Sequence, residues 1–178
     1  VRQIAASPAI QPYMLKQLNP LTWEISPHCR GIIKQEMIRL GFPVEDVAGY
    51  VAGERLAFRL KDRLPDGREF QLRDYQRQAV DAFYREGSSR GGSGLIVLPC
   101  GAGKTVVGIA AMARLNCAAL ILTTNVTSVR QWKKEILEKT TITEEQIGEY
   151  TGARKEVRPV TIATYQILTY RKSQGDDF

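Results

Sequence analysis

The stretch LPCGAGKT, residues 98–105, decides how this chain of 178 residues is interpreted. It joins an apolar run at 95–98, predicted to be a buried strand, to a small-residue stretch at 105–115, predicted to be a helix. Such a loop can wrap backbone N–H groups around phosphate oxygens, with help from the dipole of the following helix. Gly101 and Gly103 permit the turns that this requires. The sequence therefore predicts a phosphate-binding P-loop.

Two side chains at the end of the stretch have the chemistry that this loop needs. Lys104 is expected to meet the β- and γ-phosphates of a nucleotide, and the Thr105 hydroxyl to hold Mg²⁺. One position departs from the general pattern, because Leu98 stands where the first glycine is usual. A glycine turn that precedes Lys-Thr by chance is the alternative.

The residues that follow alternate between apolar runs and amphipathic stretches. Strands are predicted at 118–122 and 160–163, and a helix at 127–137. Together with the strand and helix around the P-loop, this order is typical of a parallel sheet with crossover helices, an α/β fold. Ahead of it, a helix with Tyr75 on its apolar face is predicted to end at Gly87.

The first seventy residues have a different pattern, which predicts a small α+β region. A brief strand is expected around Trp23, then a helix that starts at Ser26-Pro27 and stops at Gly41, with another helical turn at Pro43. Alternation at 56–60 predicts a further strand, which the turn Pro65-Asp66-Gly67 sends back. The predicted domains are therefore 1–70, an accessory or linker region, and 71–178.

Composition bounds the kinds of partner and compartment. The net charge of +6 and the pI near 9.3 favour phosphate-rich partners. Three cysteines form no CxxC pair, and His28 beside Cys29 lacks the neighbours of a metal site, so a reducing compartment is favoured. No apolar run reaches the length of a membrane span, and the first residues lack the layout of a signal peptide.

Four segments in order resemble the motifs of XPB-type superfamily 2 DNA helicases. They are LRDYQ at 72–76, VLPCGAGKT at 97–105, NVTSVRQWK at 125–133 and IATY at 162–165. In that family the loop usually starts with leucine, so the departure at Leu98 is expected. The resemblance implies a partial RecA-like fold, with residues 71–178 as the N-terminal portion of the ATP-binding lobe.

The resemblance also implies roles for individual residues. Gln76 corresponds to the Q-motif glutamine, whose amide can pair with an adenine edge, and Arg73 is expected nearby as a further cation. Tyr75 is interpreted as a core residue. The nucleotide site then comprises Arg73, Gln76, Pro99, Cys100, Gly101, Ala102, Gly103, Lys104 and Thr105, with Lys104 and Thr105 catalytic, Thr105 the magnesium ligand, and ATP and Mg²⁺ the cofactors.

A second set of residues matches motif positions that the family uses on the DNA backbone. These are Thr124, Asn125, Thr164 and Tyr165, which follow or close predicted strands and suit phosphate contacts with little sequence preference. Trp132 is interpreted as packing rather than as a base-stacking residue. Arg130, Lys133 and Lys134 are interpreted as a solvated face that attracts DNA.

The family's acidic Asp-Glu motif is absent from the sequence, and Asp176-Asp177 is interpreted as a polar connector. We therefore expect a truncated part of an ATP-dependent 3′–5′ DNA helicase or translocase of nucleotide excision repair or transcription, inactive as a hydrolase by itself. A nucleotide- and DNA-binding module without hydrolysis is the alternative, and a P-loop small-molecule kinase is a weaker one. The expected partners are DNA and either a repair nuclease or proteins of the transcription machinery, and no membrane is expected. The expected compartment is the cytoplasm of a bacterium or archaeon, or the nucleus of a eukaryote. The oligomeric state is left open.

Overall fold

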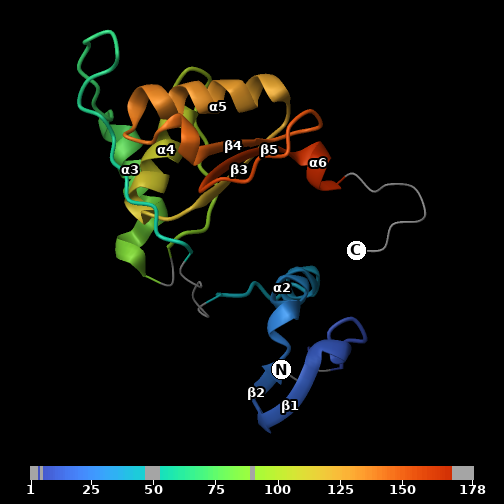
Figure 1. The fold of residues 1–178 in the computed structure, drawn as a ribbon. Helices are drawn as coiled ribbons and strands as arrows, with labels where there is room; N and C mark the ends of the chain where they lie inside the picture. Colours follow the sequence, from blue (N-terminus) through green and yellow to red (C-terminus); the bar gives the residue numbers. More distant parts are fainter. Residues whose placement is uncertain (1–3, 5, 47–52, 89–90, 170–178) are drawn as a thin grey trace. The chain divides into compact units, whose positions relative to one another are not determined.

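The computed structural model describes residues 4, 6–46, 53–88 and 91–169, which form two compact units divided at Ala48 and Gly49 (Figure 1). The predicted boundary was residue 70. The structure places residues 53–70 with the second unit, because Leu56 is buried in that unit's core. The boundary at 70, where the helicase-like motifs begin, stays a prediction about domain organisation. No helix in the described ranges is long and apolar enough to cross a membrane.

The first unit is a hairpin followed by a helix. Strand β1 (Met14–Asn19) pairs antiparallel with β2 (Thr22–Ile25), and α2 (Arg30–Arg39) follows a 3-10 turn at Pro27–Cys29. The predicted strand at Trp23 and the predicted helix are confirmed, whereas β1 was not predicted. The helix stops just ahead of Gly41, whose φ of +81° suits glycine. The helical turn predicted at Pro43 is wrong for residues 43–46, which are irregular, and 47–52 lie outside the described residues.

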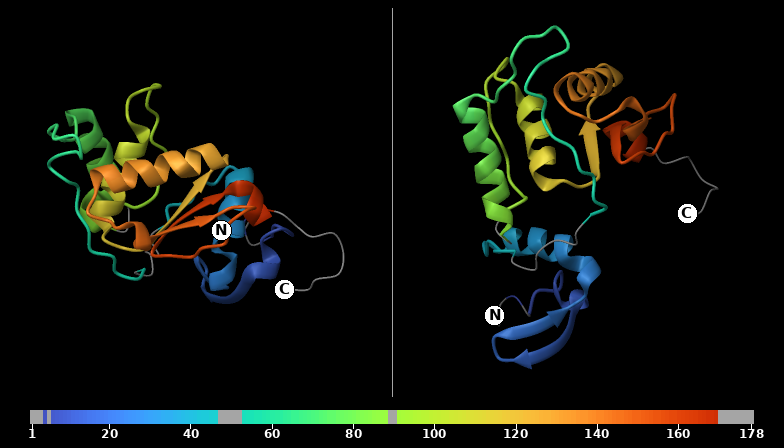
Figure 2. Two further views of the ribbon diagram at one scale, coloured as in Figure 1. Left: turned by 45° about the horizontal axis from the view of Figure 1, so that its top comes forward. Right: turned by 60° about the vertical axis from the view of Figure 1, so that its left-hand side comes forward.

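The second unit contains a three-stranded parallel sheet of order β3-β5-β4. The strands are β3 (Ala119–Thr123), β4 (Ile147–Tyr150) and β5 (Val160–Thr164). Helices α4 (Lys104–Leu115) and α5 (Val126–Lys139) accompany the sheet in this unit (Figure 2). They form one core with it through Ile109, Val129, Ile136 and Ile162. Both helices and the strands β3 and β5 were predicted and are confirmed, whereas β4 was not predicted.

The remaining helices flank this core. Helix α3 (Asp74–Tyr84) packs against α4 and buries Gln76 and Val80. A 3-10 turn at Arg85–Gly87 follows it, and another at Glu144–Gln146 precedes β4. A short α6 (Tyr165–Thr169) continues from β5. The helix predicted around Tyr75 is thus confirmed, although it ends at Tyr84 rather than at Gly87.

The strand predicted at 95–98 is wrong. These residues are irregular, and Leu95 and Val97 are 88% and 80% exposed. A strand needs a neighbour for its backbone hydrogen bonds, and none of the described strands pairs with this run. Only Leu98 packs, against the cluster that includes Val107 of α4.

The segment at 53–70 alternates as predicted but forms isolated bridges instead of a continuous strand. Arg55 pairs with Cys117 and Leu60 with Thr140. The predicted turn is confirmed, because Gly67 has a φ of +84° and the bridge between Arg63 and Glu69 closes the turn.

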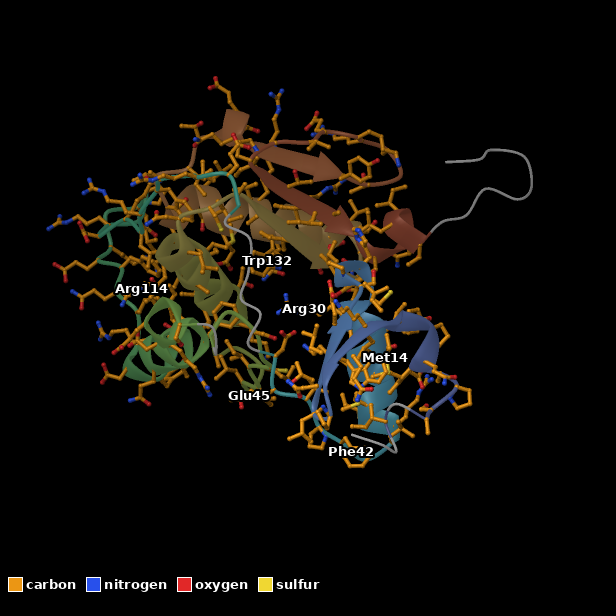
Figure 3. The ribbon with its side chains drawn as sticks, turned by 90° about the horizontal axis from the view of Figure 1, so that it is seen from below. Met14, Arg30, Phe42, Glu45, Arg114 and Trp132 are labelled. Atoms are coloured by element: carbon orange, nitrogen blue, oxygen red, sulfur yellow. The ribbon has the colours of Figure 1, made fainter. Side chains whose placement is uncertain are left out.

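Helices α5 and α4 pack closely against each other at one point. Trp132 of α5 is labelled in Figure 3. Its ring packs so near Gly108 that a Cβ on Gly108 would lie 2.6 Å from the ring atom Cη2. The interpretation of Trp132 as a packing residue is confirmed. Its neighbour Lys133 is not on a solvated face as predicted, since it lies half-buried between Glu144 (3.0 Å) and Glu149 (3.4 Å).

Candidate nucleotide-binding site

The loop before α4 has the backbone that its glycines suggest. Gly101 has a φ of +78° and Gly103 a φ of +76°, both in the left-handed region that favours glycine. The Ala102 N–H donates to the Pro99 carbonyl at 3.3 Å, which closes the turn between them. Gly103 is the N-cap of α4, so the first backbone N–H groups of the helix open toward this loop. Such an end attracts anions.

Lys104 and Thr105 occupy the first turn of α4. The Lys104 ammonium is exposed and donates to the Pro99 carbonyl at 2.9 Å, which holds it above the loop. Thr105 is half-buried. A nucleotide fits these groups, since the loop offers backbone donors, one cation and one hydroxyl. Mg²⁺ commonly takes few protein ligands beside phosphate oxygens and water, which suits Thr105. The described part of the chain holds no group of three or more His, Cys, Asp or Glu side chains that could bind a metal ion by themselves.

Helix α3 holds the loop from the side through two neighbouring side chains. The Tyr75 hydroxyl donates to the Ala102 carbonyl oxygen at 2.9 Å, and Gln76 Nε2 donates to the same oxygen at 3.0 Å. Gln76 Oε1 accepts from the Arg73 N–H at 3.0 Å, and only 5% of the residue is exposed. Both ends of the Gln76 amide are therefore engaged within the protein. The predicted contact with adenine stays a prediction.

A cleft of about 440 Å³ lies beside the loop. Its lining consists of Arg73, Tyr75, Leu98, Pro99, Cys100, Gly101 and Ala102. The Arg73 guanidinium donates to the Tyr75 hydroxyl at 3.2 Å, so a cation and an aromatic ring meet at its wall. A planar, partly apolar group attached to a phosphate chain fits such a lining. The structure thus brings together all nine residues predicted for the nucleotide site, while their roles stay predictions.

Tyr75 is the residue of this site that sequence reasoning misjudged. Its spacing from Ala79 and Phe83 suggested a core residue. In the structure it is 36% exposed and lines the cleft. Only its position next to Gln76 could have indicated a role at the loop.

The residues predicted for DNA lie at the carboxyl ends of β3 and β5. These ends are adjacent because Thr123 is in register with Thr164. Thr124, Asn125 and Tyr165 are exposed, whereas Thr164 is 5% exposed.

Asn125 has a structural task as well. Its Oδ1 accepts from the Ser128 N–H at 2.8 Å and so caps α5. Its Nδ2 donates to Thr124 Oγ1 at 3.3 Å. The structure therefore groups three exposed polar side chains here, with Thr164 beneath them.

Comparison with known proteins bears directly on this loop and the sheet behind it. The model of the family described as "Type III restriction enzyme, res subunit" matches residues 69–177. The chain belongs to this family. The matched residues include α3, the loop, α4, α5 and the sheet, and they exclude the first unit.

Individual relatives extend the similarity to nearly the whole chain. A "DNA 3'-5' helicase XPB" of Kineococcus radiotolerans is 48% identical over 97% of this chain and 29% of its own length. A protein of the same name from Mycobacterium tuberculosis is 45% identical over 99% of this chain and 30% of its own length. The resemblance to XPB-type helicases is thereby confirmed.

A eukaryotic relative is more distant. A "General transcription and DNA repair factor IIH helicase/translocase subunit XPB" of Dictyostelium discoideum is 33% identical over 84% of this chain and 18% of its length. The chain thus spans less than a third of the length of these relatives. These relatives therefore contain further parts that this chain does not cover.

Proposed function

We propose that this chain is the nucleotide-binding front part of an ATP-driven 3′–5′ DNA helicase or translocase. One observation carries the proposal: the loop at 98–105 presents Lys104 and the N-terminus of α4 beside a cleft with Arg73 and Tyr75 at its wall. Phosphates suit the loop and a base suits the cleft. The relatives' name, DNA 3'-5' helicase, supports DNA as the track, and helicase activity in turn implies ATP as the nucleotide.

In this proposal each residue has a defined task. Lys104 neutralises the terminal phosphates, and Thr105 holds Mg²⁺, which supplies charge neutralisation on the phosphates when bound. The remaining cradle consists of backbone and side-chain groups from Arg73, Gln76, Pro99, Cys100, Gly101, Ala102 and Gly103.

Thr124, Asn125, Thr164 and Tyr165 form the proposed DNA contact. Three of them expose hydroxyl or amide groups at one end of the sheet, which can bond phosphate oxygens without reading base identity. Thr164 is buried, so its contribution would come through its backbone or through support of Tyr165. DNA affinity should fall as salt rises.

The relatives also suggest the setting. We propose repair or transcription, with a repair nuclease or components of the transcription machinery as protein partners, because the eukaryotic relatives carry the name of a transcription and DNA repair factor. The compartment would be the bacterial or archaeal cytoplasm, or the nucleus in a eukaryote.

Titration with a fluorescent ATP analogue in the presence of Mg²⁺ tests the nucleotide site. Lys104→Ala should abolish or severely weaken binding, because it removes the only side-chain cation in the first turn of α4. Lys134→Ala is the matched control, since its side chain is 75% exposed on α5. Equal affinity in wild type and Lys104→Ala would refute the assignment of the loop.

Phosphate release by the full-length parent protein, with and without single-stranded DNA, tests the motor function. DNA-stimulated hydrolysis that disappears with Lys104→Ala is expected. A parent that binds nucleotide and DNA but never turns over would be a binding module instead.

A further inference from the structure

Two side chains of α3 converge on one backbone oxygen of the phosphate-binding loop. The Tyr75 hydroxyl and Gln76 Nε2 both donate to the Ala102 carbonyl, at 2.9 and 3.0 Å. A carbonyl oxygen has two lone pairs, so one carbonyl can accept both bonds. We call these two bonds the loop clamp.

The orientation of the Gln76 amide is fixed by its partners. Its Oε1 must face the Arg73 N–H, which is a donor, and its Nε2 must face the Ala102 carbonyl, which is an acceptor. A flipped amide would set donor against donor and acceptor against acceptor. Burial of Gln76 to 5% exposure makes such mismatches costly.

The clamp also fixes the direction of the next backbone N–H along the chain, that of Gly103. In a planar trans peptide the C=O and the following N–H point in opposite directions. Holding the Ala102 oxygen toward α3 therefore turns the Gly103 N–H away from α3. That N–H belongs to the set of loop donors from which a phosphate site is built.

Gly103 makes the clamp sterically possible. A Cβ on this residue would lie 2.6 Å from Gln76 Nε2, closer than real Cβ atoms come to a heavy atom. The same test at Gly101 finds nothing within 4 Å. Gly103 is thus needed both for its φ of +76° and for the approach of Gln76.

We propose that Tyr75 and Gln76 are positioning residues for the triphosphate, acting through the Ala102 carbonyl to preform the loop. The inference rests on the proposed function and deepens it. It differs from a base-reading role in one measurable respect. A clamp on the loop changes the affinity for every triphosphate, whether or not a base is attached.

The test uses Tyr75→Phe, which keeps the ring and removes one donor. Affinities for Mg²⁺ complexes of ATP, GTP and inorganic tripolyphosphate are measured by competition with a fluorescent ATP analogue. Loss of one hydrogen bond should weaken all three by the same factor, about two- to tenfold. Gln76→Ala should show the same uniform pattern. The matched control is Tyr84→Phe, which alters the other tyrosine of α3, beside Arg114.

Two results would overturn the proposal. A loss confined to ATP, with tripolyphosphate unchanged, would assign these residues to base recognition. Equal affinities in wild type and Tyr75→Phe would show that the clamp has no role in binding. If wild type binds none of the three, the proposed function itself fails.

Hydrogen exchange of the loop amides tests the clamp without any nucleotide. In Tyr75→Phe the amide of Ala102, which donates to the Pro99 carbonyl, should exchange about two- to tenfold faster, because one tether of the loop is gone. It should exchange at the wild-type rate in Tyr84→Phe. Unchanged exchange in Tyr75→Phe would refute the clamp, whatever the nucleotide titrations show.

Discussion

Gly103→Ala should destabilise the second unit more than Gly101→Ala, although both residues have nearly the same backbone conformation. Their φ values are +76° and +78°. Placing an L-residue in this region costs about 1–2 kcal/mol at either position. Alanine also restricts the unfolded chain equally in both variants, so that contribution cancels in the comparison.

The difference comes from Gln76. A Cβ at residue 103 would lie 2.6 Å from Gln76 Nε2, whereas at residue 101 it meets open space. To relieve the clash Gln76 must move, which breaks its bonds to the Ala102 carbonyl and to the Arg73 N–H. At about 0.5–1.5 kcal/mol for each bond, the extra loss should be about 1–3 kcal/mol.

Urea unfolding measures this difference. The chain has two tryptophans, Trp23 in the first unit and Trp132 in the second, so a Trp23→Phe background makes fluorescence report the second unit alone. Equal losses in the two glycine variants would refute the reasoning.

A double variant sharpens the test. Gln76→Ala removes the atom that the new Cβ strikes, so Gly103→Ala with Gln76→Ala should cost less than the sum of the two single changes. Strict additivity would show that Gln76 and residue 103 do not interact.

Two further predictions concern helix packing and pH. Gly108→Ala should destabilise the second unit, because the new Cβ would lie 2.6 Å from the Trp132 ring and overpacking costs about 1–3 kcal/mol, more than the roughly 1 kcal/mol of helix propensity gained. Gly31→Ala in α2, where a Cβ meets nothing within 4 Å, should instead stabilise the first unit in thermal unfolding, and a loss there would contradict the argument. Hydrogen bonding to Glu144, and then to Glu149, raises the pKa of Lys133 above its usual value of 10.5 despite its burial. The charge on Lys133 therefore stabilises the fold at neutral pH, and this contribution is lost as pH rises through the raised pKa. Unfolding free energy measured from about pH 9 to 12 should fall more steeply in wild type than in Lys133→Met above about pH 10, while Lys134→Met should follow wild type; parallel curves for all three would contradict the assignment.

The elements predicted correctly are those whose patterns are local and complete. Helix α4 follows from small residues after Lys104, and β5 follows from a run of apolar and β-branched residues at 160–164. Strand β4 was missed because Gly148 and Glu149 interrupt its apolar pattern. In the structure Glu149 is buried and pairs with Lys133 and Arg154, an arrangement that no local pattern announces.

The run at 95–98 shows the opposite failure. Its residues are strongly apolar, so the pattern indicates a buried strand. Burial and strand formation depend on a neighbouring strand, which is a property of the assembled sheet rather than of the segment. In the described residues β3, β5 and β4 form their own sheet, and 95–98 has no partner in it.

The candidate site divides in the same way. The loop and its two glycines could be predicted, because spacing between a strand-like run and a helix suffices. The contact between Gln76 and Ala102 spans 26 residues, and no periodicity within α3 reveals it. Tyr75 was misjudged for this reason, since its helical spacing is that of a core residue while its hydroxyl bonds the loop.

Gly103 links the two kinds of information. Its φ of +76° is a local requirement, and the motif alone predicts a glycine there. The 2.6 Å approach of Gln76 is a long-range requirement, and it excludes a side chain at the same position for a separate reason. An asparagine could adopt the left-handed backbone at modest cost, but its Cβ would still displace Gln76. The contact with α3 and the conformation of its own loop therefore both favour glycine at this position, each for its own reason.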